Sequence, residues 1–222
     1  MAYDYLNQYG GGERVLEVFC DIFPDAPIYT ILYDEEKTKG RFAGKKIHTS
    51  FLNSKFVTRN HRLFIPLMPL AAQSLDLGDQ YDLVLSATAG YGKGIKYSKF
   101  TKHLCYCYTP LRYAWEPEHL NSKFKIQNSK FRSVLFNPIL SYLRNWDYKM
   151  AQRPDFMLAD SQFIADKIKN YYKRSAEVAY PPINEGKFYF DPNVKKKNYF
   201  LATGRLVHYK KFDLIIETFN RL

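Results

Sequence analysis

The chain has 222 residues, of which 46% are hydrophobic and 25% charged, a composition typical of a globular protein and unlike that of a disordered one. No apolar run approaches the ~20 residues that a bilayer-spanning helix needs, and no basic-plus-apolar signal segment begins the chain, so we expect a cytoplasmic protein. The formal net charge of +11 predicts attraction to an anionic partner, which could be nucleic acid, an acidic membrane surface or a phosphorylated substrate.

Three consecutive glycines, Gly10 to Gly12, precede a stretch whose apolar residues follow the spacing of one buried helix face: Val15, Val18, Phe19 and Ile22. Glycine permits positive φ and lets another group approach the backbone closely. The unpaired amides at a helix start favour an anion, commonly a phosphate. The triplet fits neither the dinucleotide fingerprint nor the phosphate-binding P-loop, so a plain strand-to-helix turn is an equal alternative.

Strands and helices alternate along the following residues, which favours a parallel α/β sheet covered on both faces. We expect strands at 26–34, 45–52, 79–88, 102–110, 155–160 and 175–183, and helices at 66–74, 131–152 and 161–172. Ligands bind such sheets at the carboxyl ends of the strands. The candidate site is therefore the rim formed by four loops: 10–12, 86–94, 108–115 and 160–161.

Residues 181–198 combine prolines, a glycine and a lysine run, as an interdomain linker does. We expect residues 1–190 to form a first domain, 191–198 to be a linker, and 199–222 to begin an incomplete second domain with a strand at 199–206 and a helix at 210–222. One strand and one helix cannot bury their own apolar faces. We expect this βα unit to continue in a longer protein, and its docking on the first domain is the alternative.

The segment ATAGYGKGI, residues 87–95, resembles a P-loop but lacks the motif's first glycine, where Ala87 stands, and its final serine or threonine, where Gly94 stands. We therefore expect a mobile loop. No D-x-D motif or spaced ligand cluster predicts a metal site, and the acidic run 34–37 is expected to be a solvated turn. The three cysteines are predicted to be small buried thiols: Cys20, Cys105 and Cys107.

The segment GRLVHYKK, residues 204–211, contains two cations suited to a diphosphate. Arg205 offers a bidentate fork and Lys210 a point charge at the start of a helix. Taken by spacing alone, two solvated cations on a loop are the simpler interpretation.

Five blocks of the chain occur in this order: GGGERVLEVFCDIFPDAPIYTILYD, CYTPLRYAW, LRNWDYKMAQRPDFMLADSQFIADKI, VAYPPIN and FLATGRLVHYKKFDLIIETF. Together they resemble the family 4 glycosyltransferases, and most nearly the mannosyltransferase-like enzymes of surface-polysaccharide assembly. The resemblance implies a GT-B fold of two Rossmann-like domains, with the acceptor held mainly by the first and the nucleotide-sugar donor mainly by the second. It also implies a metal-independent, cofactor-free transfer that retains the anomeric configuration.

The resemblance assigns roles residue by residue. Gly11 and Gly12 would face the donor phosphates, while Arg205 and Lys210 would be the catalytic cations that hold the diphosphate. The acceptor-side candidates are Tyr108, Thr109 and Arg112; the family usually has histidine where this chain has Tyr108. The family's second domain continues well beyond the point matching Leu222 and contains two donor-binding glutamates, so we expect this chain to be inactive alone.

The expected activity is transfer of a hexose, with GDP-mannose as one candidate donor and UDP-glucose as a rival, to a saccharide or lipid-linked acceptor at the inner membrane face. The basic stretch 123–132 runs into an apolar one and could rest on an anionic bilayer, although an ordinary core helix fits equally well. The rivals are a basic nucleic-acid-binding module and a partner subunit of a split transferase. No helix-turn-helix, RNA-recognition or zinc signature is present, so nucleic acid is not the expected partner.

Overall fold

A computed structural model of the chain describes residues 1–116, 129–183, 186, 188–195, 197–204, 206 and 210–221, and for 129–136 it describes the backbone alone. The chain divides into two compact units, Met1–Pro182 and Ile183–Leu222. Each unit is described below by itself.

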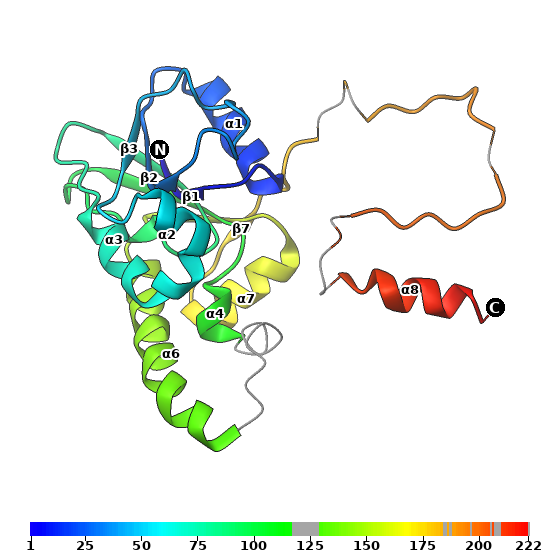
Figure 1. The fold of residues 1–222 in the computed structure, drawn as a ribbon. Coiled ribbons are helices and arrows are strands. Elements are labelled where there is room, and N and C mark those ends of the chain that lie inside the picture. The colour runs from blue at the N-terminus through cyan, green and yellow to red at the C-terminus, as the bar shows by residue number, and fades with distance from the viewer. Residues whose placement is uncertain are drawn as a thin grey trace. The chain divides into compact units, whose positions relative to one another are not determined.

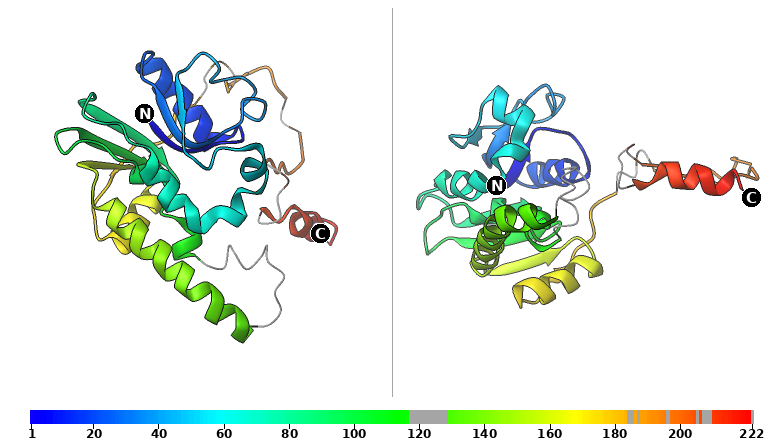
Figure 2. Two further views of the ribbon diagram at one scale, coloured as in Figure 1. Left: turned by 60° about the vertical axis from the view of Figure 1, so that its left-hand side comes forward. Right: turned by 60° about the horizontal axis from the view of Figure 1, so that its bottom comes forward.

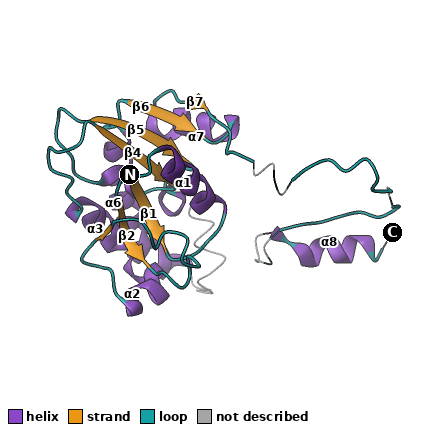
Figure 3. Cartoon of the chain, turned by 90° about the horizontal axis from the view of Figure 1, so that it is seen from above, coloured by secondary structure: helices purple, strands orange, loops and turns teal. Residues whose placement is uncertain are grey.

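The first unit is built on a seven-stranded sheet in which every neighbouring pair of strands is parallel. The strands follow the order β3-β2-β1-β4-β5-β6-β7, and Figure 3 shows them side by side from β2 to β7. This arrangement confirms the predicted α/β, Rossmann-like fold class. The strand bounds are β1 Ala2–Leu6, β2 Ile28–Tyr33, β3 Ile47–Thr49, β4 Leu83–Thr88, β5 Lys102–Cys107, β6 Phe156–Ala159 and β7 Glu177–Val178.

Helices connect the strands of the first unit (Figure 1). They are α1 Gly11–Ile22, α2 Lys55–Asn60, the 3-10 turn η1 His61–Leu67, α3 Met68–Ser74, the 3-10 turn η2 Gly92–Gly94, α4 Arg112–Trp115, α6 Ser129–Ala151 and α7 Gln162–Tyr172. The predicted helices at 66–74, 131–152 and 161–172 correspond to α3, α6 and α7. The short helix α2 was missed, although its start has a sequence signal: the Ser54 hydroxyl accepts the N–H of Val57 at 3.2 Å as an N-cap.

The strand order determines which face of the sheet each helix covers. The chain steps in one direction from β1 to β3 and in the opposite direction from β4 to β7. Because βαβ crossovers are right-handed, this reversal places α1 on one face and the later helices on the other (Figure 2). Leu16 of α1 packs in a core with Leu85, whereas Met68 of α3 and Trp146 of α6 pack in a separate core with Val84. The sheet is therefore covered on both sides, as predicted.

Helix α1 buries a narrower face than its apolar spacing predicts. Val15, Leu16 and Cys20 are buried, but Ile22, the last residue of the helix, is 61% exposed. The cysteine prediction is confirmed, since Cys20, Cys105 and Cys107 are all buried thiols in the described structure.

The second unit contains α8, Phe212–Phe219, within the predicted helix at 210–222. The strand predicted at 199–206 is wrong for residues 199–204, which form no regular structure. Phe200 packs against Phe219 with ring centroids 4.7 Å apart, yet remains 83% exposed. A strand needs a neighbour to satisfy its backbone, and the described part of this unit supplies none.

Candidate functional site

The carboxyl ends of β1, β4, β5 and β6 meet at one edge of the first unit because all the strands are parallel. Strands β1 and β4 are adjacent at the position where the strand order reverses direction. Ligand sites of open α/β sheets form at this kind of switch point. The loops that follow these strands are therefore the first place to look for a site.

The glycine-rich loop after β4 is filled by a carboxylate of the protein itself. Asp4, buried in β1, accepts the hydroxyl of Thr88 at 2.6 Å. It also accepts three backbone N–H groups, from Ala89 at 2.5 Å, Tyr91 at 2.8 Å and Gly92 at 2.6 Å. Successive amides of this kind form a concave nest that elsewhere binds phosphate. Burial raises the pKa of Asp4, whereas the hydrogen bonds from Thr88, Gly92 and Ala89 act in the opposite direction by favouring its charged form. The nest is closed to an external anion.

The lysine of the same loop is buried in an ion pair. Lys93 is fully buried, with its Nζ 2.6 Å from Asp147 Oδ1 of α6, and it also donates to the carbonyl of Gly90. Asp147 Oδ2 accepts the indole N–H of Trp115 at 2.8 Å and the hydroxyl of Tyr172 at 2.7 Å. Burial opposes the charge of Lys93, but the Asp147 carboxylate keeps the lysine pKa above its ordinary value. The prediction of a mobile loop at 87–95 is therefore wrong: these groups fix it in the core.

The first turn of α1 also contains a buried carboxylate. Glu13 Oε2 accepts the N–H of Gly10 at 2.7 Å, and Glu13 Oε1 accepts the Tyr3 hydroxyl at 3.1 Å. Glycine has no side chain, so this is one half of a capping box. The negative charge of Glu13 offsets the positive end of the helix dipole, where an anion was expected.

The three glycines at this turn do not need left-handed backbone. None of them has positive φ, and Gly10 is extended at φ −148°. A Cβ on Gly12 would lie 2.6 Å from the Tyr3 hydroxyl and 3.4 Å from the Tyr108 ring, so packing requires glycine there. A Cβ on Gly11 would meet nothing within 4 Å, which leaves Gly11 facing outward.

Two of the predicted site residues lie together at this edge. The Tyr108 hydroxyl, which follows β5, donates to the carbonyl of Gly12 at 2.9 Å and so joins the loops after β1 and β5. Burial raises the pKa of Tyr108 well above its usual value, so the phenol stays protonated. Of the other acceptor-side candidates, Thr109 is buried and Arg112 is exposed at the start of α4.

The predicted donor-binding cations belong to the second unit. Lys210 is exposed and lies two residues before the first residue of α8. Arg205 lies outside the described residues. Their assignment to a diphosphate remains a prediction.

The loop after β6 adds an acidic group to the rim. Asp160 is half-buried, and the Ser161 hydroxyl donates to its Oδ1 at 2.9 Å. Burial raises the pKa of Asp160, while this hydrogen bond lowers it. Burial, with a contribution from the Asp160 charge, raises the pKa of the neighbouring Tyr106 to about 12. Ser161 also caps α7 by accepting the N–H of Ile164 at 3.4 Å.

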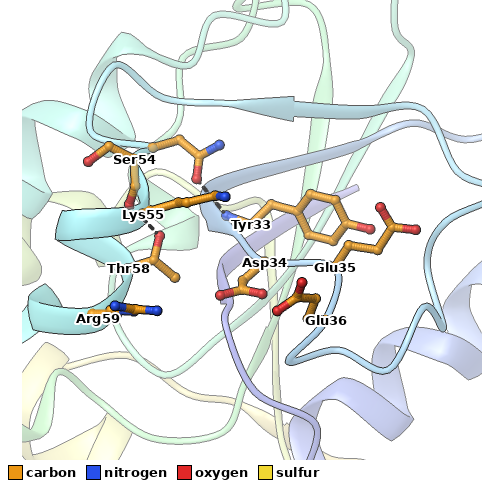
Figure 4. Close-up of a pocket in the computed structure, with 9 residues that line it drawn as sticks. Tyr33, Asp34, Glu35, Glu36, Ser54, Lys55, Thr58 and Arg59 are labelled. Atoms are coloured by element: carbon orange, nitrogen blue, oxygen red, sulfur yellow. Dashed lines mark hydrogen bonds between the residues drawn. The ribbon is translucent and has the colours of Figure 1, made fainter.

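A polar pocket opens farther along the same edge, at the carboxyl ends of β2 and β3. Its volume is about 530 Å³, within the range of small-molecule sites. Figure 4 shows acidic side chains from the turn after β2 facing side chains of α2. The lining residues are Tyr33, Asp34, Glu35, Glu36, Asn53, Ser54, Lys55, Thr58 and Arg59.

Sequence reasoning missed this pocket. Residues 34–37 do form a turn, as predicted, and Lys37 pairs with Asp34 across 3.4 Å. The turn nevertheless presents its acids to α2, a helix that the sequence pattern did not reveal. Three consecutive acids directly after a strand were an available signal, because that position is the ligand edge of a parallel sheet.

The pocket brings hydrogen-bond acceptors and donors to opposite walls. The carboxylates can accept hydroxyl protons, while Lys55 and Arg59 can donate to ring or hydroxyl oxygens. Such a lining suits a polyhydroxylated ligand. Within the described part of the chain, no group of three or more His, Cys, Asp or Glu side chains is placed to hold a metal ion.

The fold and this edge define the first unit as a Rossmann-like α/β domain with a polar pocket at the carboxyl ends of β2 and β3. Comparison of the chain with protein-family models, with curated proteins and with solved structures gives no match. No helix in the described residues is long and apolar enough to cross a bilayer. The side chains of the predicted membrane stretch 123–132 lie outside the described part of the structure.

Proposed function

We propose that the chain belongs to a glycosyltransferase that moves a hexose from a nucleoside-diphosphate donor to a saccharide or lipid-linked acceptor at a membrane face. The observation that carries the proposal is the order of the five sequence blocks over nearly the whole chain. A parallel Rossmann-like sheet with a glycine turn after its first strand is the framework that the resemblance implies. GDP-mannose is the donor we favour.

The proposed donor contacts are cationic. Arg205 and Lys210 would stabilise the departing diphosphate. One well-placed donor in a dry site contributes roughly 3–4 kcal/mol to a developing charge, against ~0.3–1 kcal/mol for a surface helix dipole. Because Glu13 already offsets that dipole, the cations would dominate.

The proposed acceptor site is the polar pocket at β2, β3 and α2. Its facing acids and cations can satisfy the hydroxyl groups of a saccharide from both sides. In the transfer, the bond between the anomeric carbon and the diphosphate oxygen breaks, and the acceptor hydroxyl oxygen forms the new bond. The hydroxyl proton leaves to a base or to water, and retention of the anomeric configuration is part of the proposal.

The test is ligand binding by the chain itself, measured by saturation-transfer NMR with GDP-mannose, UDP-glucose and a mannose oligosaccharide. We expect GDP-mannose and the oligosaccharide to bind, and we expect E35Q/R59Q to weaken the oligosaccharide alone. The matched control is D79N, which removes an acid from a second cavity of about 440 Å³ on the same unit and should change neither ligand.

A different outcome would select a rival function. Tight, steeply salt-dependent oligonucleotide binding without any nucleotide-sugar or saccharide binding would favour the basic nucleic-acid module and sink the transferase. Binding of UDP-glucose in preference to GDP-mannose would keep the transferase and change its donor.

A further inference from the structure

The polar pocket at the carboxyl ends of β2 and β3 lies between two walls of opposite charge (Figure 4). One wall is the turn after β2, which presents Asp34, Glu35 and Glu36. The other wall is α2, which presents Lys55 and Arg59. A ligand in this pocket therefore meets negatively charged acceptors on one side and positively charged donors on the other.

The backbone of both walls is fixed by hydrogen bonds within the protein. The buried hydroxyl of Thr38 donates to the carbonyls of Asp34 and Glu35, each at 3.0 Å, and holds the acidic turn. Asn53 Oδ1 accepts the N–H of Tyr33 at 3.0 Å and joins the end of β2 to the loop before α2. The pocket is thus preformed, so binding requires little ordering of the protein.

The charges of the two walls do not neutralise one another. Asp34 pairs with Lys37, which lies outside the pocket lining. Within the part of the chain that the structure describes, the other charged lining residues form no ion pair. They are Glu35, Glu36, Lys55 and Arg59, all of them exposed. Two negative and two positive charges thus face each other across the pocket without pairing.

We infer that this pocket binds a sugar unit that carries both an ammonium group and an anionic group, as a phosphorylated amino sugar does. The ammonium group would face the two glutamates, and the anionic group would face Lys55 and Arg59. The side-chain amide of Asn53 and the hydroxyl of Ser54 also line the pocket and can donate to ring oxygens. The inference rests on the proposed function only in taking the ligand to be a saccharide.

Ligands of other charge leave at least one wall uncompensated. A ligand that enters the pocket displaces water from charged side chains, and only an opposite charge on the ligand replaces that hydration. A neutral sugar would compensate neither wall. A simple anion would be repelled by the glutamates, and a simple cation by α2. A divalent metal ion is a poor occupant, since no group of three or more His, Cys, Asp or Glu side chains among the described residues is placed to hold one.

The experiment is calorimetric titration of the 222-residue chain with four sugars that differ in the two charged groups. They are glucosamine 6-phosphate, glucosamine, glucose 6-phosphate and glucose, used at slightly acidic pH, where the amine is protonated. We expect glucosamine 6-phosphate to bind at least about fivefold more tightly than either singly charged sugar, because it alone pairs with both walls. Added salt should reduce this preference, since the pocket charges are exposed.

Two double variants separate the walls. In E35Q/E36Q the acidic wall loses its unpaired charges, so glucosamine 6-phosphate should bind no better than glucose 6-phosphate. In K55Q/R59Q the basic wall is neutral, so glucosamine 6-phosphate should bind no better than glucosamine. Each double variant should leave unchanged the affinity for the singly charged sugar whose charge pairs with the intact wall.

The matched controls are D25N and R62Q, which remove exposed charges outside the pocket lining. They should leave all four affinities unchanged, and unaltered thermal melting of every variant verifies folding. Affinities that agree within about twofold for all four sugars, or no binding of any of them, would overturn the inference. So would equal weakening of all four sugars by both double variants.

The same titrations distinguish this inference from the proposed function. Binding of the mannose oligosaccharide without a preference for glucosamine 6-phosphate would contradict the inference and leave the proposed transferase standing. Selective binding of glucosamine 6-phosphate without any binding of GDP-mannose would support the inference and count against the proposed donor.

Discussion

Replacing Asp147 by asparagine removes the negative charge opposite Lys93 while keeping the size of the side chain. Both groups are fully buried, and the Asp147 carboxylate also accepts hydrogen bonds from Leu111, Trp115 and Tyr172. The variant D147N would leave the lysine charge without a counter-ion in the core. Breaking a buried pair in this way costs about 3–5 kcal/mol, which is a large part of the ~5–15 kcal/mol that stabilises a typical domain.

The assay is urea unfolding followed by tryptophan fluorescence, because Trp115 donates a hydrogen bond to Asp147 and Trp146 is the residue before Asp147 in the chain. In thermal melts, the same loss corresponds to a fall of about 6–20 °C in Tm for a unit of this size. K102Q is the matched control, since Lys102 pairs with Asp155 at 3.0 Å but is 69% exposed, and its loss should cost no more than about 1 kcal/mol.

A second variant separates the ion pair from the surrounding hydrogen bonds. In K93M/D147N neither charge remains, so the double variant should recover at least about 1 kcal/mol relative to D147N, a coupling typical of residues in contact. If D147N lies within about 1 kcal/mol of wild type, or if K93M adds to its cost, the buried pair does not fix the loop after β4.

Three further predictions follow from single contacts. G94A should destabilise the chain by about 1–3 kcal/mol in urea unfolding, because the added Cβ would lie 2.4 Å from the Trp146 ring. G44A is the control and should not destabilise the chain, since a Cβ on Gly44 would meet nothing within 4 Å. Equal losses of stability in the two variants would contradict the packing argument. Burial lowers the pKa of His103 to about 3, so below pH ~6.5 the unfolded chain takes up a proton that the folded chain refuses. The free energy of unfolding should therefore fall by up to ~1.4 kcal/mol for each pH unit as the pH is lowered from about 6.5 to 3. Urea denaturation at several pH values should show a flatter dependence of stability on pH in H103Q than in wild type. E13Q should tighten nucleotide-sugar binding about two- to fivefold in calorimetry, since it removes a carboxylate from the start of α1; weaker binding would rule out an anion at that turn.

The amino-acid sequence by itself determined the class of fold and the order of its elements. Apolar runs of four to eight residues separated by helical periodicity are local signals, and they located every strand after the first along with the helices α1, α3, α6 and α7. The burial of Cys105 and Cys107 on one face followed from their spacing in β5. Local signals failed where an element was short, as in α2, or where a strand had no partner, as at residues 199–204.

Only the tertiary structure decided what the loops at the carboxyl edge do. Asp4 reaches the loop after β4 across 84 to 88 positions of sequence, and Tyr108 reaches Gly12 across 96. These partners meet because β1 is inserted between β2 and β4, and no local pattern encodes that insertion. The loop at 87–95, which most resembled a phosphate site, is consequently filled by the Asp4 carboxylate. The acids of the turn at 34–37, predicted to be solvated, line the polar pocket instead. Local periodicity specifies what each segment becomes, but the strand order specifies which segments meet.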